Sequence, residues 1–426
     1  MMALCVNNVQ AQTEERRMLS IEELFSLADS NNLTIREFTV SVDMAEENVK
    51  VAKNSFLPSV NASLSLGYNG NGMITDRNFS HSFVAPIPHF GNNFAVEVSQ
   101  VIFAGGAIRN GLKIAELQSQ LAALNAESNR QEVRFLIAGN YLELCKLQNQ
   151  LQILESHIAQ TQKMLKNMHV RVNEGAALQN DITRYELQLQ NLHYAKIQLQ
   201  NAMYLLNSQL VTAAGLPKSV VIETASSLHS PSTRDGEIPP RLSGERALSV
   251  QMAEKAEKMA EHAEKITRAE RLPHIALFAG DYLNGPVTIE IPALNKNFNY
   301  WAVGVGVKYN LDNFYKSGTK IRVSQLAARR ATAEKAVAEE HAALAIEAAQ
   351  VHYGEAFALL ETKEKSEELA VQNYNVIAYR YENDLALITD LLDAASQKLD
   401  AELQAINARI NIVYNYYKIK YISGTL

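Results

Sequence analysis

The sequence predicts a mainly α-helical protein with a small β part, in which long antiparallel coiled-coil helices accompany four transmembrane β-strands. Three observations lead to this fold class. Only 19 glycines and 10 prolines interrupt 426 residues, so the elements are long. Apolar residues recur every three or four positions in narrow stripes, which is typical of a coiled-coil seam. Four shorter segments alternate apolar with small or polar residues, which is typical of strands.

The composition excludes several functional classes. The 40 basic and 46 acidic residues give a net charge of −6, which argues against a nucleic-acid partner. The chain is 47% hydrophobic and 20% charged, so it can pack a core and is not disordered throughout. No apolar run reaches the roughly 18 residues of a membrane-spanning helix, so a membrane role would have to come from strands.

The chain is predicted to be an internal duplication. The matching pairs are segments 55–60 and 270–275, segments 103–109 and 315–322, and Gly215 and Gly424. Their offsets, 215, 212 and 209 residues, are nearly constant. Two structural repeats, 20–215 and 243–426, are therefore expected to share one order of elements: helix, two strands, long helix and closing helix.

Two segments are expected to lie outside the repeats. Residues 216–242 hold four of the ten prolines and are predicted to be a connector at the equatorial level, without a core element. Residues 1–19 are interpreted as a signal-peptide remnant and N-terminal tail, because Val9-Gln10-Ala11 resembles a signal-peptidase site. A disordered cytosolic tail is the alternative, and Cys5 is a candidate lipid acceptor.

In the first half, the opening helix is predicted over 20–54. It begins with a capping box at Ser20 and Glu23 and ends before Pro58. A strand follows at 60–68, then a long loop at 69–93 and a returning strand from Phe94. The long helix and the closing helix that complete the half are predicted at 106–171 and 181–214.

The second half repeats this order. The opening helix is predicted at 243–271, the first strand starts at 275, and the second strand is predicted at 301–311. The long helix follows at 319–381 and the closing helix at 391–423. Each long helix would be about 100 Å at ~1.5 Å per residue. In each half, the summed length of the two short helices matches the length of the long helix. This predicts that the two short helices stack end to end beside the long one.

The strands have the length of membrane strands, since each run is close to the ~9 to 11 residues that cross a bilayer. One face is apolar and the other is small and polar. Trp301, Tyr309, Tyr68 and Phe94 lie near strand ends, where interfacial aromatics occur. Because about eight strands are needed to close a barrel, four strands in a membrane require an oligomer. The alternative is a soluble sheet packed on helices.

Three glycines are predicted to form the strand-to-helix turns. Gly105 and Gly106 precede the first long helix, and Gly318 precedes the second. Glycine tolerates a sharp change of chain direction at low conformational cost, which is why these positions are interpreted as structural.

Several motifs of the sequence together resemble a known family. The doubled plan, the Leu-Pro before each first strand, the Phe-x-Gly-Gly opening of a long helix and the ending Ile-Ser-Gly-Thr-Leu resemble the TolC family of bacterial outer-membrane efflux proteins. The resemblance covers residues 20–426, and its most specific segment is 381–394. It implies a homotrimer in the cell outer membrane that extends into the periplasm, with a 12-stranded barrel and an α-helical tunnel.

The resemblance also implies a function and partners. The protein would be the exit duct of a tripartite efflux or type I secretion system, surrounded by outer-membrane lipid. A periplasmic adaptor, or membrane fusion protein, would join it to an inner-membrane transporter of the RND or ABC class. No catalysis, cofactor or metal is implied, and the sequence shows no helical Glu-x-x-His pair. A soluble periplasmic coiled-coil scaffold without a pore is the alternative.

The candidate working residues lie at the turn before the last helix. Asp390 and Asp393 are three residues apart on one helix face, where carboxylates also favour a helix N-terminus. The resemblance implies instead a ring of aspartates that selects cations at the periplasmic entrance. Tyr381 matches a gate tyrosine. Ala386 stands where its basic partner is expected, so the closing network is either weaker here or built from other residues, with Arg380 as the candidate.

The corresponding turn of the first half is predicted at 172–175, followed by Asp181. The internal repeat makes it the counterpart of the gate turn. Turns of this kind are expected to meet the helical hairpin tips of the adaptor.

Overall fold

The computed structural model describes residues 15–175, 178–224, 247–383 and 385–426. These residues form two compact units. The helical unit lies within Met1–Ser41, Leu124–Met252 and Val337–Leu426, and the sheet unit comprises Val42–Ala123 and Ala253–Ala336. Each unit therefore takes segments from both halves of the sequence.

Seven helices and eight strands occur among the described residues. The helices are α1 (Ile21–Asn31), α2 (Leu33–Asn54), α3 (Ala107–Asn173), α4 (Gln179–Ala213), α5 (Leu248–Ala269), α6 (Asn313–Glu382) and α7 (Ile388–Ile422). The strands are β1 (Glu15–Leu19), β2 (Ser59–Tyr68), β3 (Gly72–Thr75), β4 (Ser82–Ala85), β5 (Phe90–Phe103), β6 (Val220–Thr224), β7 (His274–Gly285) and β8 (Phe298–Lys308). The predicted mainly α fold with a small β part is confirmed. Within the described ranges, no helix combines the length and apolarity needed to cross a membrane.

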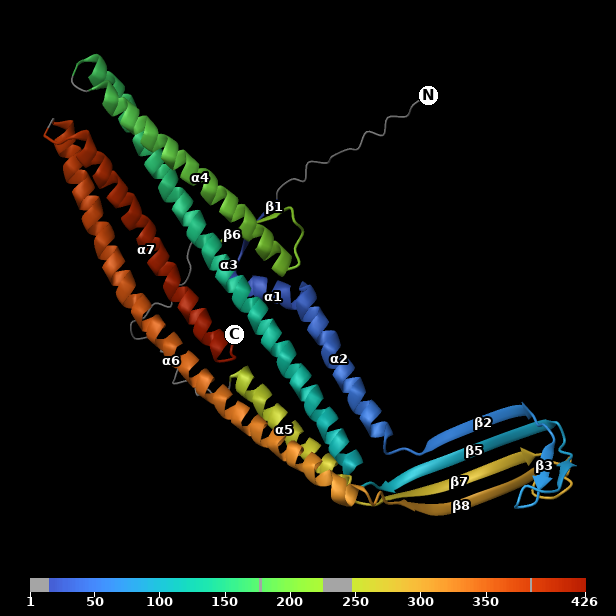
Figure 1. Cartoon of the computed structure of the whole chain (residues 1–426). Helices are drawn as coiled ribbons and strands as arrows, with labels where there is room; N and C mark the ends of the chain where they lie inside the picture. The colour runs from blue at the N-terminus through green and yellow to red at the C-terminus, as the bar shows by residue number, and fades with distance from the viewer. Residues whose placement is uncertain (1–14, 176–177, 225–246, 384) are drawn as a thin grey trace, which may run out of the picture. The chain divides into compact units, whose positions relative to one another are not determined.

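The sheet unit is organised around one four-stranded antiparallel sheet, with strand order β2-β5-β7-β8 (Figure 1). Its pairing runs without a shift except between Val101 and Phe103 in the β5–β7 ladder. Paired residues of an antiparallel ladder lie on the same face of the sheet. The outer strands β2 and β8 each have one edge with no partner among the described strands.

The loop predicted at 69–93 contains structure of its own. Residues Gly72–Thr75 and Ser82–Ala85 pair as a short antiparallel hairpin, β3–β4. The hairpin lies at the end of the sheet remote from α5, within the same unit (Figure 1). The prediction of an unstructured loop is wrong here, because the short runs Met73-Ile74 and Phe83-Val84 were overlooked among the asparagines and glycines.

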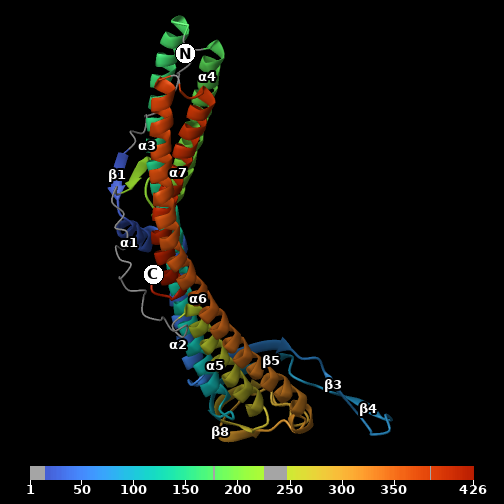
Figure 2. The same cartoon turned by 90° about the vertical axis from the view of Figure 1, so that its left-hand side faces the viewer.

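The helical unit contains two antiparallel helical hairpins, α3–α4 and α6–α7, which run side by side (Figure 2). The largest core cluster joins α1, α3, α4, β6 and α7. Leu24, Ile137 and Leu210 in it are fully buried, and the Tyr141 hydroxyl donates to the Leu19 carbonyl oxygen at 2.9 Å. These apolar contacts follow the predicted three-and-four stripes.

The opening helix is not continuous, which corrects the prediction of one helix over 20–54. The capping box at Ser20 and Glu23 is confirmed. However, Asn32 has an extended backbone and ends α1. Its side chain accepts from the Thr34 amide at 2.9 Å and donates to the Ala213 carbonyl oxygen at 2.8 Å. An asparagine that caps a new helix and bonds to another one favours this break.

Part of the predicted connector belongs to the core. Strand β6 pairs in parallel with β1, and Val220 and Ile222 are 0% and 1% exposed. The expectation that 216–242 contains no core element is therefore wrong for Val220–Thr224. The run Val-Val-Ile is β-branched and apolar, and it outweighs the neighbouring prolines. Residues 1–14, with Cys5 and the signal-peptide interpretation, and 225–242 lie outside the described residues.

Candidate functional site

The sheet has an apolar face whose large side chains are exposed. Trp301 is 76% exposed, and Val303 and Val60 are 69% and 65% exposed. The apolar residues that the register places on this face are Val60, Ala62, Leu64, Leu66, Tyr68, Phe90, Phe94, Val96, Val98, Ile275, Leu277, Ala279, Leu283, Trp301, Val303, Val305 and Val307. Four polar residues, Asn92, Gln100, Asp281 and Asn299, lie on the same face. Exposed apolar surface of this extent indicates an apolar environment or a partner.

The predicted interface aromatics occupy different places on this face. Tyr68 ends β2, Phe94 lies within β5, and Trp301 is the fourth residue of β8. Tyr309 follows the last residue of β8, outside the strand. Their role at a membrane interface stays a prediction.

The opposite face is only partly as predicted. On β2 it carries Asn61, Ser63 and Ser65, which are small and polar. On β7 and β8, however, it carries Phe278, Tyr282, Tyr300 and Phe298. The expectation of a uniformly small and polar face is wrong there, because glycines and alanines in the neighbouring positions leave room for large rings.

The first strand-to-helix turn contains the predicted glycines. Gly105 and Gly106 have φ of 61° and 85°, a left-handed conformation that strongly favours glycine. A Cβ on Gly105 would stand 3.0 Å from both Cβ and the carbonyl oxygen of Ala269. This position therefore requires glycine for backbone conformation and for close packing against α5.

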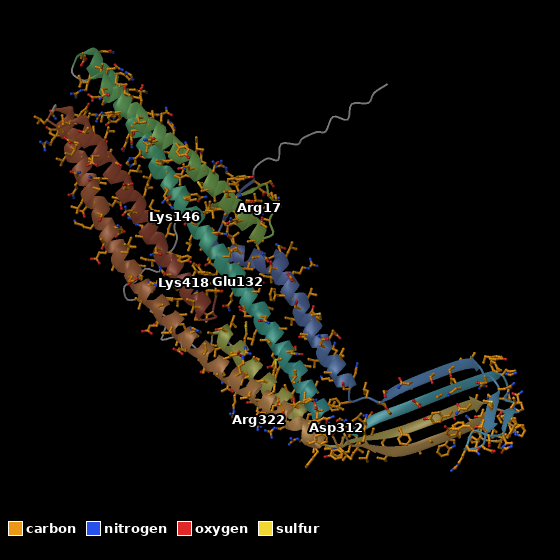
Figure 3. The ribbon with its side chains drawn as sticks, in the orientation of Figure 1. Arg17, Glu132, Lys146, Asp312, Arg322 and Lys418 are labelled. Carbon is orange, nitrogen blue, oxygen red and sulfur yellow. The ribbon has the colours of Figure 1, made fainter. Side chains whose placement is uncertain are left out.

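Gly318 does not form the second turn, which corrects the prediction. Helix α6 begins at Asn313, so Gly318 lies inside its first two turns. The chain turns instead through Asn310–Asp312, where the Asn313 amide donates to the Asn310 carbonyl oxygen at 3.1 Å. Asp312 lies directly before α6 (Figure 3), and a 2.9 Å bond from the Lys316 ammonium lowers the pKa of its carboxyl. In the second half, an aspartate beside the helix N-terminus therefore occupies the turn that glycines occupy in the first half.

The α3–α4 and α6–α7 turns are held by one apolar cluster in the helical unit. Its buried residues are Met168, Ile182, Tyr185, Tyr381, Ile388 and Leu391. Tyr381 is 7% exposed and Leu391 is fully buried. The predicted gate tyrosine is thus a core residue that joins the two turns within one chain.

The two aspartates are exposed and have local hydrogen bonds. Asp390 Oδ2 accepts from the Leu387 backbone amide at 3.1 Å, and Asp393 Oδ2 accepts from Gln397 Nε2 at 2.8 Å. In the first half, Asp181 Oδ2 accepts from the Leu178 amide at 3.2 Å in the same way. Asp390 therefore serves the start of α7, as a carboxylate in a first helical turn does. A selectivity ring remains a proposal.

Arg171 is the basic residue beside the tyrosine, and the sequence interpretation missed it. Its guanidinium lies 5.3 Å from the centre of the Tyr381 ring, within the range of a cation–π contact. Arg380, the hypothesised partner, is exposed. The two arginines are 209 residues apart, the same offset as Gly215 and Gly424, so the repeat contained the signal that identifies Arg171.

Metal ligation has no support in the described ranges, where no group of three or more His, Cys, Asp or Glu side chains could hold an ion. The geometry therefore consists of an exposed apolar sheet face, an aromatic and polar face behind it, and a carboxylate-bearing turn at the end of a helical hairpin.

Known proteins show similar sequences. Residues 24–216 match the family model described as outer membrane efflux protein. The chain is 20% identical over 410 residues to the outer membrane protein TolC of Vibrio cholerae, across 96% of this chain and 91% of that protein. It is also 20% identical over 159 residues to the outer membrane efflux protein BepC of Brucella suis, across 37% of this chain and 32% of that protein.

Solved structures share the fold. The outer membrane protein VceC from Vibrio cholerae superposes with a TM-score of 0.78 at 14% identity, over 95% of this chain and 96% of that chain. The Campylobacter jejuni CmeC outer membrane channel gives 0.79 at 13% identity, over 95% and 85%. The family model over residues 24–216, the TolC homologue that spans 96% of the chain and these folds agree with the doubled plan and the sheet: residues 24–216 match the outer membrane efflux protein family, and the chain as a whole is similar to outer membrane proteins in sequence and fold.

Proposed function

We propose that the protein is the outer-membrane exit duct of a tripartite efflux or type I secretion system. In this role three copies close one β-barrel in the membrane and one helical tunnel in the periplasm. The observation that carries the proposal is the four-stranded antiparallel sheet, which combines an exposed Val/Leu/Trp face with two open edges. An apolar outer face and closed edges are what a strand-built membrane protein requires.

The strand directions support closure between copies. Because β2, β5, β7 and β8 alternate in direction, β8 of one copy and β2 of the next would also run antiparallel. A barrel of about eight strands is filled by its own side chains, whereas a larger one leaves a lumen. Three copies would supply twelve strands and an open pore.

Exposed heptad positions on the helices support the same assembly. Val337, Leu344 and Val351 follow one another at seven-residue steps on α6 and are 50%, 55% and 54% exposed. On α4, Leu187 and Tyr194 show the same spacing and are each 63% exposed. Apolar stripes at this spacing fit the seam of a coiled coil with a neighbouring copy.

The α6–α7 turn is the proposed periplasmic entrance. Three copies would bring Asp390 and Asp393 together as six carboxylates around one axis. Six crowded carboxylates attract multivalent cations, so the entrance would select cations. Tyr381 and Arg171 would hold the turn in place beside it. A periplasmic adaptor would engage the helical hairpins and connect them to an RND or ABC transporter.

The test is the conductance of purified protein in planar lipid bilayers, compared with the double variant Asp390→Ala/Asp393→Ala. The proposal predicts discrete, cation-selective steps that are blocked by multivalent cations. In the variant, both the selectivity and the block should decrease. If the steps are unchanged in the variant, the protein is still a channel but the proposed aspartate ring is refuted. A folded, detergent-independent protein without steps would favour a periplasmic scaffold.

A further inference from the structure

An aromatic cluster lies on the sheet face opposite Trp301. Tyr282 and Tyr300 are paired across β7 and β8, and their ring centroids are 5.0 Å apart with planes 21° apart. Phe298, two residues before Tyr300 on the same face, adds a third ring at 5.4 Å. Rings at these separations and angles stack favourably. The cluster is therefore an ordered aromatic surface built from two strands.

Glycines in the same strands make room for rings that lean over the sheet. A Cβ on Gly280 would stand 2.6 Å from the Tyr282 hydroxyl oxygen. A Cβ on Gly304 would stand 2.7 Å from Cζ of Phe278, which lies on the same face. Glycine inside a strand often marks such a close approach. The sequence thus contains both the rings and the space that they occupy.

Polar groups beside the rings accept hydrogen bonds and carry negative charge. The Tyr282 hydroxyl donates to Glu97 Oε1 at 3.1 Å. Asn284, paired with Phe298, has a buried Oδ1 that receives no hydrogen bond from the described residues. Within the four strands, the basic residues on this face are His274 and Lys308, which lie at the opposite end of β7 and β8. The cluster therefore combines aromatic ring faces, a carboxylate and an acceptor oxygen that receives no hydrogen bond. No basic residue of the four strands lies near it on this face.

We propose that this aromatic cluster binds organic cations that contain an aromatic ring. Aromatic rings attract cations, and a nearby carboxylate adds to this attraction. The inference rests on the proposed function, since the face lines the lumen if the Trp301 face meets lipid. Three copies would then place three clusters around one pore. Partial exposure of the rings, 40% for Tyr300 and 53% for Phe298, fits weak binding, which a conducting pore requires.

The test uses bilayer conductance with three small probes: benzyltrimethylammonium, the anion benzenesulfonate and the neutral benzyl alcohol. All channels carry Asp390→Ala/Asp393→Ala, so that entrance carboxylates do not bind the cation. We expect benzyltrimethylammonium to reduce the current, and the other two probes to reduce it far less. The pair Tyr282→Leu/Tyr300→Leu should weaken this block on the order of tenfold, as expected for a cation–π site.

Two further variants separate charge from fold. Glu97→Gln keeps an acceptor for the Tyr282 hydroxyl but removes the negative charge. It should weaken the block by benzyltrimethylammonium and leave the effect of the other two probes unchanged. Phe90→Leu, which removes an aromatic ring from the apolar face, should leave the block unchanged. If the tyrosine pair fails to form channels, Glu97→Gln and Tyr300→Phe decide the result, because Tyr300→Phe should retain the block.

The outcomes distinguish this inference from the proposed function. Absence of any conductance would overturn the proposed function and this inference with it. Channels that conduct but show equal block by all three probes would overturn the cation assignment. Block that is identical in the Asp390→Ala/Asp393→Ala parent, in Glu97→Gln and in the tyrosine pair would overturn the site while leaving the duct intact.

Discussion

Cys145 is held in the core of the helical unit, where it is 3% exposed. Burial raises the pKa of its thiol, against hydrogen bonds with Thr224 and Asn149 that lower it. Because the thiolate is the reactive form, the native thiol should be inert. In a Cys5→Ala background at pH 8, we expect its reaction with a thiol reagent to be at least ~10-fold slower than in denaturant. Equal native and denatured rates would contradict this placement.

His157 and Glu402 form a polar contact between α3 and α7. The two side chains meet at 2.7 Å, and His157 is 7% exposed. Burial raises the pKa of the Glu402 carboxyl, but His157 and Lys398 together outweigh it and lower the pKa below 4.5. A carboxyl group whose pKa is lower in the folded than in the unfolded state stabilises the fold at pH values above its ordinary pKa. This stabilisation is lost as the pH falls through the lowered pKa.

The Glu402→Ala variant should therefore lose about 1–3 kcal/mol of stability at neutral pH, since His157 is left buried without its acceptor. The difference from wild type should shrink once the pH falls below 4.5. Thermal melts followed by circular dichroism measure both effects. Glu368→Ala, which removes an exposed pair with Lys365, is the matched control and should change little. A difference that grows on acidification would refute the assignment.

Single residues also show what the sequence could and could not predict. The capping box at Ser20 and Glu23 is local, so its spacing was sufficient to predict it. The partner of Tyr381 is not local, because Arg171 reaches it from the other helical hairpin. Three-dimensional proximity of this kind cannot be obtained from spacing alone, although the internal repeat provided an indirect signal.

Among the elements, the turn into α3 depends most on one residue. Gly105→Ala should destabilise the protein by about 1–2 kcal/mol for the left-handed backbone alone, with a further loss from the contact with Ala269. Gly111→Ala is the control, because it lies inside α3 with open space around its Cβ position. This control should be neutral or stabilising by about 0.5–1 kcal/mol. Comparable melting temperatures for the two variants would show that the turn does not require glycine.

Elements with a long period were predicted well, and short ones were not. The stripes of α3 and α6 repeat over many turns, so most of the predicted ends of these helices lie within a few residues of the observed ends. Strand β6 and the β3–β4 hairpin have four or five residues per strand, too few for periodicity to outweigh neighbouring prolines and asparagines. The start of α6 differs from the prediction because the helix begins at Asn313, directly after Asp312, and Gly318 lies inside it.

At the scale of the assembly, the exposed α6 stripe gives a direct prediction. Leu344→Glu places a charge in the proposed seam and should shift the detergent-solubilised protein from the proposed trimer to smaller species in native electrophoresis. Ala343→Glu adds the same charge at the next exposed position, off the stripe, and should preserve the trimer. If both variants migrate as wild type, α6 does not contact a neighbouring copy in this way.

The assembly itself could be predicted only indirectly. Strand length and alternation predicted four membrane-length strands, and the impossibility of closing them within one chain required an oligomer. The number of copies came from the family resemblance. The apolar heptad positions left exposed on α4 and α6 became visible only in the structure, because the sequence does not separate a stripe that packs within the chain from one that faces a neighbour.

Contact between the apolar sheet face and lipid can be tested through Trp301, the single tryptophan of the chain. The measurement is Trp301 fluorescence after reconstitution into vesicles whose lipids carry bromine on the acyl chains. A membrane-inserted sheet should give strong quenching by brominated lipid and weak quenching by aqueous acrylamide. Fluorescence that is insensitive to brominated lipid but readily quenched by acrylamide would contradict a membrane-inserted sheet and favour the periplasmic scaffold.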